Sequence, residues 1–349
     1  MRILKPWAIP SLLPTSAIKD PDERLPIAVL VSREGLGDTL LKLPLLRAIA
    51  RGCPGRPIWW LAAYQTAAAG PLRDFLPSAL REVREFVGFD KPRSAARRRL
   101  AEMGPFSLVF DTRSGFAGVH AAWRHLRCRA FYCCLPGYLL SSARPPGRIF
   151  RPRHIGERAL SLAQAALGDA ADGSGRIEAS AAARRHAAAL LDEGPVHVGL
   201  ALGSRETRKN WPIARFLALA ELLKAASLSP VLLLGPKERD RALMLRREHA
   251  DLTAIEFLDP EAGVSSLDLA VAVLGRLAAV VANDSGLGHL AAAAGLPVVS
   301  LFGPTDPRRW APMAPAGRIL RARDFGGEEM ARIPPEAVLA AVREILPAG

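Results

Sequence analysis

The stretch AVVANDSGLGHLAAAAGLPVVSLFG, residues 279–303, decides the fold. Two short aliphatic runs, 279–284 and 298–303, have the composition of buried parallel strands. Between them, a turn rich in Gly and Ser leads into an Ala-rich helix over 290–295. A strand, a turn, a helix and a second strand in this order predict a βαβ unit of an α/β domain.

The same rhythm continues outward along the chain. Further strands are predicted in the second half at 196–202 and 231–235, and in the first half at 27–32, 58–63 and 107–111. A chain of 349 residues, half of them apolar, is long enough for two cores. We therefore predict two doubly wound, Rossmann-like domains facing a central cleft, with a Pro-rich arm at 1–25, an N-terminal domain at 26–180 and a C-terminal domain at 181–349.

Composition excludes several classes of protein. No apolar run reaches the roughly 18 residues of a membrane span, and Pro10 and Pro14 interrupt the only candidate for a signal peptide. The four cysteines show no C-x-x-C spacing, which indicates neither a zinc site nor a disulfide framework. These features predict a cytoplasmic protein.

The positive charge is concentrated in the first half of the chain. Residues 1–150 carry 23 Lys and Arg against 11 Asp and Glu, whereas residues 151–349 carry 24 against 23. A basic field of this kind attracts an acidic partner such as nucleic acid, anionic lipid or a phosphorylated glycan. A nucleic-acid partner is not predicted, because no known nucleic-acid motif accompanies the charge.

The turn after the first predicted strand, REGLGD at 33–38, leads into a predicted helix over 39–50. Glycines at such a turn let backbone N–H groups approach an anion, and Asp38 is expected at the carboxyl end of the sheet. A dinucleotide fingerprint would need a third Gly at Leu40 and an acid after the next strand, and both are missing. The alternative for Asp38 is a simple helix N-cap.

Two more polar loops follow strands in the second half. GSRETRKNWP at 203–212 combines hydroxyls and cations ahead of a helix, and NDSGLGH at 283–289 opens the helix of the deciding stretch. Helix-start amides, Ser285 and His289 offer hydrogen-bond donors to a diphosphate. The alternatives are a solvated basic loop and a histidine that serves only as a structural hydrogen-bonder.

Four motifs in this order resemble glycosyltransferase family 9, the ADP-heptose:lipopolysaccharide heptosyltransferases. They are R-x3-G-D-x5-P at 33–44, G-S-x4-K-x-W-P at 203–212, D-S-G-x-x-H-L-A at 284–291 and F-G-P-T-D-P at 302–307. The resemblance implies the GT-B architecture, with the acceptor bound by the N-terminal domain and the nucleotide sugar by the C-terminal domain. It also implies an inverting transfer of a heptose or related sugar from an ADP-sugar to an acidic, lipid-linked glycan of the lipopolysaccharide core.

The resemblance also assigns roles to residues of this chain. Asp38 matches the general base, and Gly35, Gly37 and Thr305 fall in loops near donor or acceptor. The donor-binding positions implied are Ser204, Lys209, Glu238, Asp284, Ser285, Gly286 and His289. Glu238 aligns only loosely with an acid that meets the ribose, and a solvated glutamate is its alternative.

No cofactor and no metal are expected. The only Asp-x-Asp, at 20–22, lies in the Pro-rich arm away from every predicted strand end. With a single carboxylate base and no carboxylate nucleophile, one displacement with inversion is the natural mechanism. The alternatives are a family member with another nucleotide sugar or acceptor, and a nucleotide-sugar-binding protein without transfer activity.

The acceptor side is expected to be basic. Cations that could face an anionic acceptor or the inner leaflet of the membrane, with the protein bound peripherally, are Arg97, Arg98, Arg99, Arg124 and Arg127. The segment 123–129 alternates cations with apolar residues in the manner of an interfacial segment. Its alternative is a solvated, arginine-rich surface.

Overall fold

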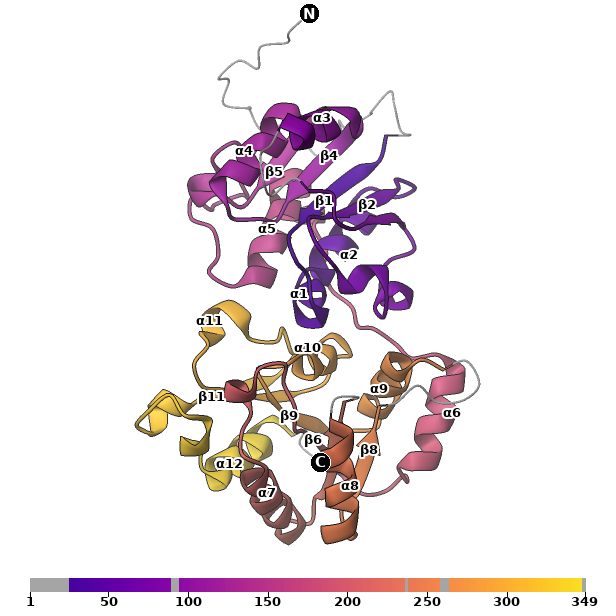
Figure 1. Cartoon of the computed structure of the whole chain (residues 1–349), viewed down its shortest axis with the longest axis vertical. Helices are drawn as coiled ribbons and strands as arrows, with labels where there is room; N and C mark the ends of the chain where they lie inside the picture. Colours follow the sequence, from indigo (N-terminus) through magenta and orange to yellow (C-terminus); the bar gives the residue numbers. More distant parts are fainter. Residues whose placement is uncertain (1–24, 89–93, 236–237, 258–263, 347–349) are drawn as a thin grey trace, which may run out of the picture.

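The computed structural model describes residues 25–88, 94–235, 238–257 and 264–346. The chain forms two α/β domains that are stacked along the long axis of the molecule (Figure 1). Apart from residue 25, the predicted arm lies outside the described residues. The prediction of two domains with parallel sheets is confirmed.

The upper domain in Figure 1 contains a five-stranded parallel sheet in the order β3-β2-β1-β4-β5. Its strands are β1 Ile27–Val31, β2 Ile58–Ala62, β3 Leu80–Arg84, β4 Phe106–Asp111 and β5 Cys128–Cys133. Its helices are α1 Leu36–Leu41, α2 Leu43–Gly52, α3 Ser94–Glu102, α4 Phe116–His125 and α5 Ile155–Leu167.

The lower domain contains a six-stranded parallel sheet in the order β11-β10-β9-β6-β7-β8. Its strands are β6 His197–Ala201, β7 Ser229–Leu234, β8 Thr253–Glu256, β9 Ala279–Asn283, β10 Val298–Phe302 and β11 Gly317–Arg321. Its helices are α6 Ala181–Leu190, α7 Ile213–Ala225, α8 Arg239–Glu248, α9 Ser266–Leu274, α10 Gly286–Ala293, α11 Pro307–Trp310 and α12 Pro335–Ile345.

The strands predicted from sequence are the inner strands of both sheets. β1, β6, β9 and β10 are buried at every position, because helices cover both faces of each sheet. The four strands that the sequence analysis did not predict, β3, β5, β8 and β11, are the edges of the two sheets. Their sequences, such as LREVR in β3, mix polar and apolar residues because one side of an edge strand faces solvent.

The helix predicted over 39–50 is two helices. α1 begins three residues earlier, at Leu36, and ends at Leu41, and α2 begins at Leu43. Pro44 has no backbone N–H to continue the helical ladder, but it is tolerated in the first turn of α2. The break leaves α1 as a short separate element, and α1 extends toward the lower domain in Figure 1.

α10 also begins earlier than predicted, at Gly286 instead of residue 290. Glycine is a poor helix former, which is why the sequence pattern misplaced this start. The close packing of α10 explains the glycines. A Cβ at Gly286 would lie 3.0 Å from Cδ2 of Leu36, and one at Gly288 would lie 3.1 Å from Cβ of Ala282.

The chain passes from the upper to the lower domain between α5 and α6 (Figure 1). The connection is tied to both sides: Ile177 N–H donates to Ala293 O at 2.8 Å, and Arg51 pairs with Asp172 at 2.6 Å. Within the described residues, every helix is too short or too polar to cross a bilayer.

Candidate active site

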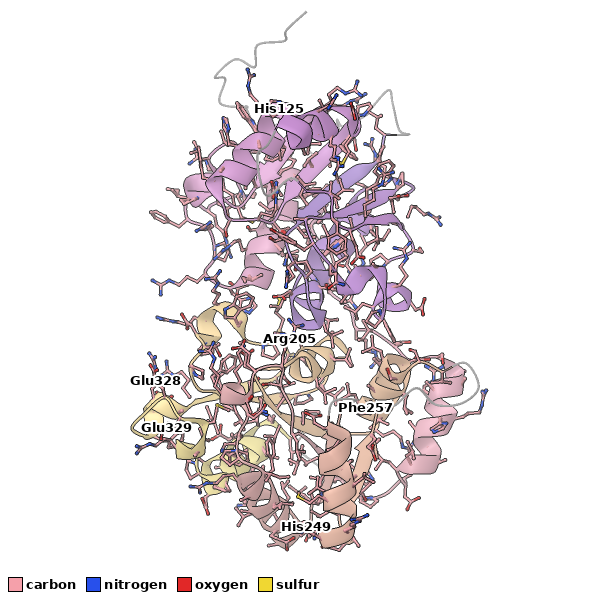
Figure 2. The ribbon with its side chains drawn as sticks, viewed as in Figure 1. His125, Arg205, His249, Phe257, Glu328 and Glu329 are labelled. Carbon is pink, nitrogen blue, oxygen red and sulfur yellow. The ribbon has the colours of Figure 1, made fainter. Side chains whose placement is uncertain are left out.

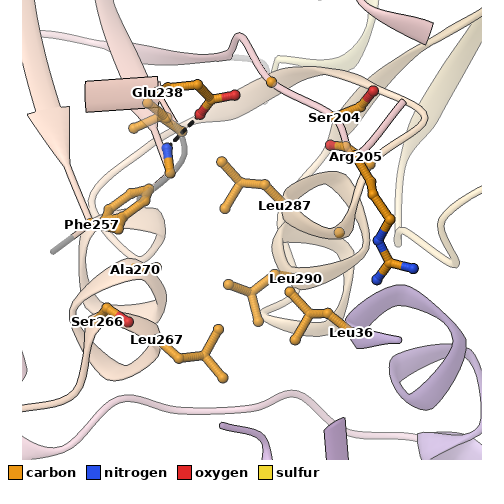
Figure 3. A pocket seen from close by; sticks show the side chains of 15 residues that line it. Leu36, Ser204, Arg205, Glu238, Phe257, Ser266, Leu267, Ala270, Leu287 and Leu290 are labelled. Atoms are coloured by element: carbon orange, nitrogen blue, oxygen red, sulfur yellow. Dashed lines mark hydrogen bonds between the residues drawn. The ribbon is translucent and has the colours of Figure 1, made fainter. Parts of the chain in front are cut away.

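The lower domain holds a cavity of about 430 Å³ at the carboxyl ends of β6, β7 and β9. Its apolar lining includes Phe257, Leu267 and Leu290, which Figure 3 labels, and Leu233. The lining also has polar groups, which are Ser204, Glu238, Ser285 and the backbone of Gly203 and Gly286. A cavity that combines an apolar lining with a few polar groups suits a nucleotide.

Glu238 forms part of this cavity wall and is held in place by the backbone. Its Oε2 accepts the Gly235 N–H at 2.6 Å, the contact drawn in Figure 3. A Cβ placed on Gly203 would lie only 1.3 Å from Oε1 of Glu238. The carboxylate therefore occupies the space that the missing side chain of Gly203 leaves open.

The N-terminus of α10 faces the polar end of the same cavity. Ser285 is the residue before the first helical position, and its side chain does not cap the helix. Its Oγ is buried and makes no hydrogen bond to any described part of the chain. The Ser285 hydroxyl and the first amides of α10 are therefore suited to donate hydrogen bonds to an anionic ligand.

Lys209, Asp284 and Thr305 form one cluster behind this helix start. Lys209 Nζ lies 2.9 Å from Oδ2 of Asp284, and Thr305 Oγ1 donates to the same oxygen at 2.8 Å. The Asp284 carboxylate thus orients a cation and a hydroxyl that come from two other loops. A bound diphosphate would contact the Lys209 ammonium and not the Asp284 carboxylate, because two anions repel each other.

Asn283 anchors the loop that carries Ser204 and Lys209, and the sequence analysis did not assign it a role. Its Nδ2 donates to Leu202 O and its Oδ1 accepts the Trp211 N–H, each at 2.9 Å. One buried amide thereby ties both ends of the 203–210 loop to β9. The only sequence signal was a polar residue at the end of an aliphatic strand.

The upper domain contributes a second cavity, of about 560 Å³, which Asp38 lines. Asp38 is at the third position of α1, and its Oδ2 accepts the Gly35 N–H at 3.1 Å. This is the reciprocal part of a capping box, so Asp38 is not itself the N-cap. The carboxylate remains half-buried and faces a space large enough for a substrate.

A second carboxylate, Glu34, lines the same cavity and was not assigned a role from sequence. It is buried and paired with Lys42, with 2.5 Å between Nζ and Oε2. Burial raises the pKa of Glu34, and the ammonium of Lys42 opposes that rise. Because Glu34 is engaged by Lys42, Asp38 is the better placed of the two to receive a proton from a ligand.

α1 and α10 meet directly between the two cavities. A Cβ on Gly37 would lie 2.5 Å from Cδ2 of His289, so only glycine lets the imidazole ring approach α1. The ring is buried and lines a neighbouring cavity, not the one beside Ser285. Burial lowers the pKa of His289 to about 4, which leaves the ring neutral near physiological pH.

Arg205 reaches across the same boundary from the lower domain, and it is a further residue to which the sequence analysis gave no individual role. A Cβ at Gly35 would lie 2.9 Å from Arg205 Nη2 and 3.3 Å from Asp38 Oδ2. Figure 2 places Arg205 where the two domains meet, and Figure 3 shows its side chain extending toward the upper domain. The guanidinium therefore lies beside both cavities.

The arginines proposed for the acceptor or membrane surface lie elsewhere. Arg98 and Arg99 are exposed on α3, at the end of the upper domain away from the lower domain (Figure 1). The side chain of Arg97 is outside what the structure describes. Arg124 and Arg127 flank His125, which Figure 2 shows at the same far end. The segment 123–129 is the end of α4 and the start of β5, with Leu126 buried between them.

Clusters of three or more His, Cys, Asp and Glu side chains that could hold a metal ion are absent from the described ranges. The two cavities instead offer hydroxyls, amides and cations. The sequence 20–22 is outside the described residues.

Comparison with known proteins places this chain in a family. A family model for glycosyltransferase family 9 (heptosyltransferase) matches residues 146–332. Lipopolysaccharide heptosyltransferase 1 of Pseudomonas aeruginosa is 30% identical over 305 residues, which cover 80% of this chain and 79% of that relative. The chain belongs to glycosyltransferase family 9.

Other family 9 relatives match in part or in fold. Lipooligosaccharide heptosyltransferase 2 of Haemophilus influenzae is 34% identical over 134 residues, so the match spans only 38% of this chain and 38% of that relative's length. The solved E. coli heptosyltransferase WaaC with ADP has a TM-score of 0.63 and 21% identity, covering 91% of this chain and 99% of that one. The likeness confirms the predicted GT-B fold.

Proposed function

We propose that this family 9 chain transfers a heptose, or a related sugar, from an ADP-sugar to an acidic glycan of the lipopolysaccharide-core type. One observation carries the proposal: α1 separates the two cavities and contributes to both. Leu36 lines the lower cavity beside Ser285 and Gly286, and Asp38, two residues later, lines the upper one. A donor in the first and an acceptor in the second would meet at α1.

The lower cavity has the parts that a nucleoside diphosphate needs. The apolar wall near Phe257 suits a base, the Glu238 carboxylate suits ribose hydroxyls, and Ser285 with the α10 amides suits a diphosphate. A relative with this fold was solved with ADP, which supports ADP as the nucleotide.

The chemistry follows from the groups at α1. Asp38 removes the proton from the acceptor hydroxyl as that oxygen attacks the anomeric carbon, and general-base catalysis of this kind contributes about 10² to 10⁴-fold. The bond from the anomeric carbon to the diphosphate oxygen breaks in the same displacement, which inverts the configuration. Lys209, Ser285 and the helix start stabilise the departing diphosphate without a metal ion. His289 is expected to hold α10 against α1.

The upper cavity suits an anionic acceptor. Arg33, Arg158 and Arg309 line it from three different parts of the chain, together with the buried Lys42. Its other acid besides Asp38 is the Glu34 that Lys42 neutralises. Phosphate or carboxylate groups on the acceptor would therefore enter a field of net positive charge.

Incubation with ADP-heptose and a heptose-deficient lipopolysaccharide core tests the proposal. We expect ADP release that requires the acceptor, continues in EDTA and gives a product of inverted anomeric configuration by NMR. A thermal-shift panel of ADP-, GDP- and UDP-sugars identifies the donor, because a tighter ligand raises the melting temperature further. Stabilisation by ADP-sugars without transfer to any core acceptor would support the alternative of a non-catalytic binding protein.

A further inference from the structure

A long stretch of the upper domain is rich in arginine and contains no acidic residue. Between Asp111 and Glu157 the chain has eight arginines and no aspartate or glutamate. This stretch contains α4, β5 and the segment 134–154 that leads to α5. In Figure 1 that segment descends along one side of the upper domain and enters α5 beside α11.

Large apolar side chains stand exposed in the same stretch. Phe150 is 83% exposed, Ile149 62% and Phe116 56%. We call these three side chains the apolar rim. Single exposed apolar residues are common on soluble proteins, but two consecutive ones of this size at a chain segment's tip leave a considerable apolar area in water.

The backbone that follows Ile149 and Phe150 is held in place by hydrogen bonds. Arg151 Nη1 donates to Cys134 O at 2.5 Å, Arg158 Nε donates to Pro152 O at 3.0 Å, and His154 Nε2 lies 2.8 Å from Ala311 O. The backbone on the C-terminal side of the tip is thus bound to both domains. The two apolar side chains project from an anchored support.

The apolar rim lies near the proposed acceptor cavity. Phe116 lines that cavity, and so do Ile155 and Arg158, which follow the tip in the chain. Five residues separate Phe150 from Ile155, a span of at most about 18 Å. Ile149 and Phe150 are thus carried by the segment that leads directly into the wall of this cavity.

We propose that the apolar rim docks this chain on an anionic lipid bilayer, with Ile149 and Phe150 entering the interface. Arg144, Arg148 and Arg153, all exposed, would face the lipid phosphates beside them. Apolar side chains surrounded by cations are the usual composition of an interfacial contact, and each cation near the surface strengthens the attraction to anionic lipid. Residues 112–156 contain no acidic side chain, and among the three cations only Arg153 has an acidic side chain, Asp306, in electrostatic reach, which favours a bilayer over a protein partner of mixed charge. The proposal deepens the proposed function, since a lipid-linked acceptor would then be presented at the cavity.

Cosedimentation of the full chain with vesicles tests the surface. The probes are vesicles of phosphatidylcholine alone and of phosphatidylcholine mixed with phosphatidylglycerol. We expect binding to the anionic vesicles only, weakened by salt, and a loss of at least about tenfold in the variant Ile149→Ser/Phe150→Ser. Leu243→Ser is the matched control, because Leu243 is 47% exposed on α8 of the lower domain.

The charge reversal Arg98→Glu/Arg99→Glu tests the competing surface on α3, and we expect it to leave vesicle binding largely unchanged. Loss of binding in this variant with full binding in Ile149→Ser/Phe150→Ser would overturn the proposal in favour of α3. Equal binding to both vesicle types, or no binding, would also overturn it. Transfer to a lipid-free core acceptor separates the two proposals. The variant Ile149→Ser/Phe150→Ser should transfer sugar to this acceptor as the wild type does. Absence of transfer by the wild type would contradict the proposed function but not the membrane surface.

Discussion

Gly203→Ala should weaken ADP binding by displacing Glu238. The new Cβ would lie 1.3 Å from Oε1 of Glu238, so the carboxylate must move. It would leave the Gly235 N–H, which it accepts at 2.6 Å, and its proposed position at the ribose. A hydrogen bond to a charged group contributes about 1.5 to 3 kcal/mol, which predicts a rise in Kd of about 10- to 100-fold.

The fold should survive this change. The displaced atoms are the end of a flexible side chain, so we expect the free energy of unfolding to fall by no more than the lost hydrogen bond to Gly235 contributes, about 1.5 to 3 kcal/mol. Gly115→Ala is the matched control, because a Cβ there meets no atom within 4 Å and its φ of −78° suits alanine. Gly115 lines the other cavity, so ADP affinity should be unchanged.

Calorimetric titration with ADP of Gly203→Ala, Glu238→Gln and the double variant measures whether the two residues act together. If the alanine acts through Glu238, the double variant should bind no more weakly than the worse single variant. Losses that add would mean that the new methyl group blocks the ligand itself. Wild-type affinity in Gly203→Ala would refute the placement of Glu238 in the donor site.

Three further predictions concern the residues between the cavities. Asp38→Asn should lower kcat at least about 100-fold with ADP affinity nearly intact, and retained turnover would remove Asp38 as the base. Lys209→Ala and His289→Ala should each weaken ADP binding in the same titration. EDTA should not affect turnover, and inhibition by EDTA that magnesium reverses would show a metal requirement. In the folded chain His289 stays neutral down to its pKa of about 4, whereas in the unfolded chain it takes up a proton below about pH 6.5. The free energy of unfolding should therefore fall as the pH is lowered from about 6.5 to about 4. Urea titrations should show a loss of up to about 3 kcal/mol that His289→Gln lacks, and an equal pH dependence in both proteins would contradict the buried, neutral ring.

The sequence by itself determined the inner strands of both sheets, because strands covered on both faces must be continuous aliphatic runs. The strand-end motifs around Asp38, Gly203 and Asp284 were also visible, since parallel strands bring their carboxyl ends to one edge. That Asp284 binds Lys209 and Thr305 could not be read from the sequence, because the three come from different loops and meet only in the folded chain.

The edge strands and the pairing between the domains were decided by tertiary structure alone. The edge strands β3, β5, β8 and β11 lack a periodic apolar pattern. Their place in the sheet depends on pairing with the neighbouring strand, which their own sequences do not reveal. Arg205 beside Gly35 and His289 against Gly37 depend on how one domain sits on the other, which no local pattern encodes. The charge count placed the positive excess in the first half of the chain. Only the structure showed that the arginines on α3 lie at the end of the upper domain away from the lower domain, and that Ile149 and Phe150 are exposed, because exposure depends on what the rest of the chain covers.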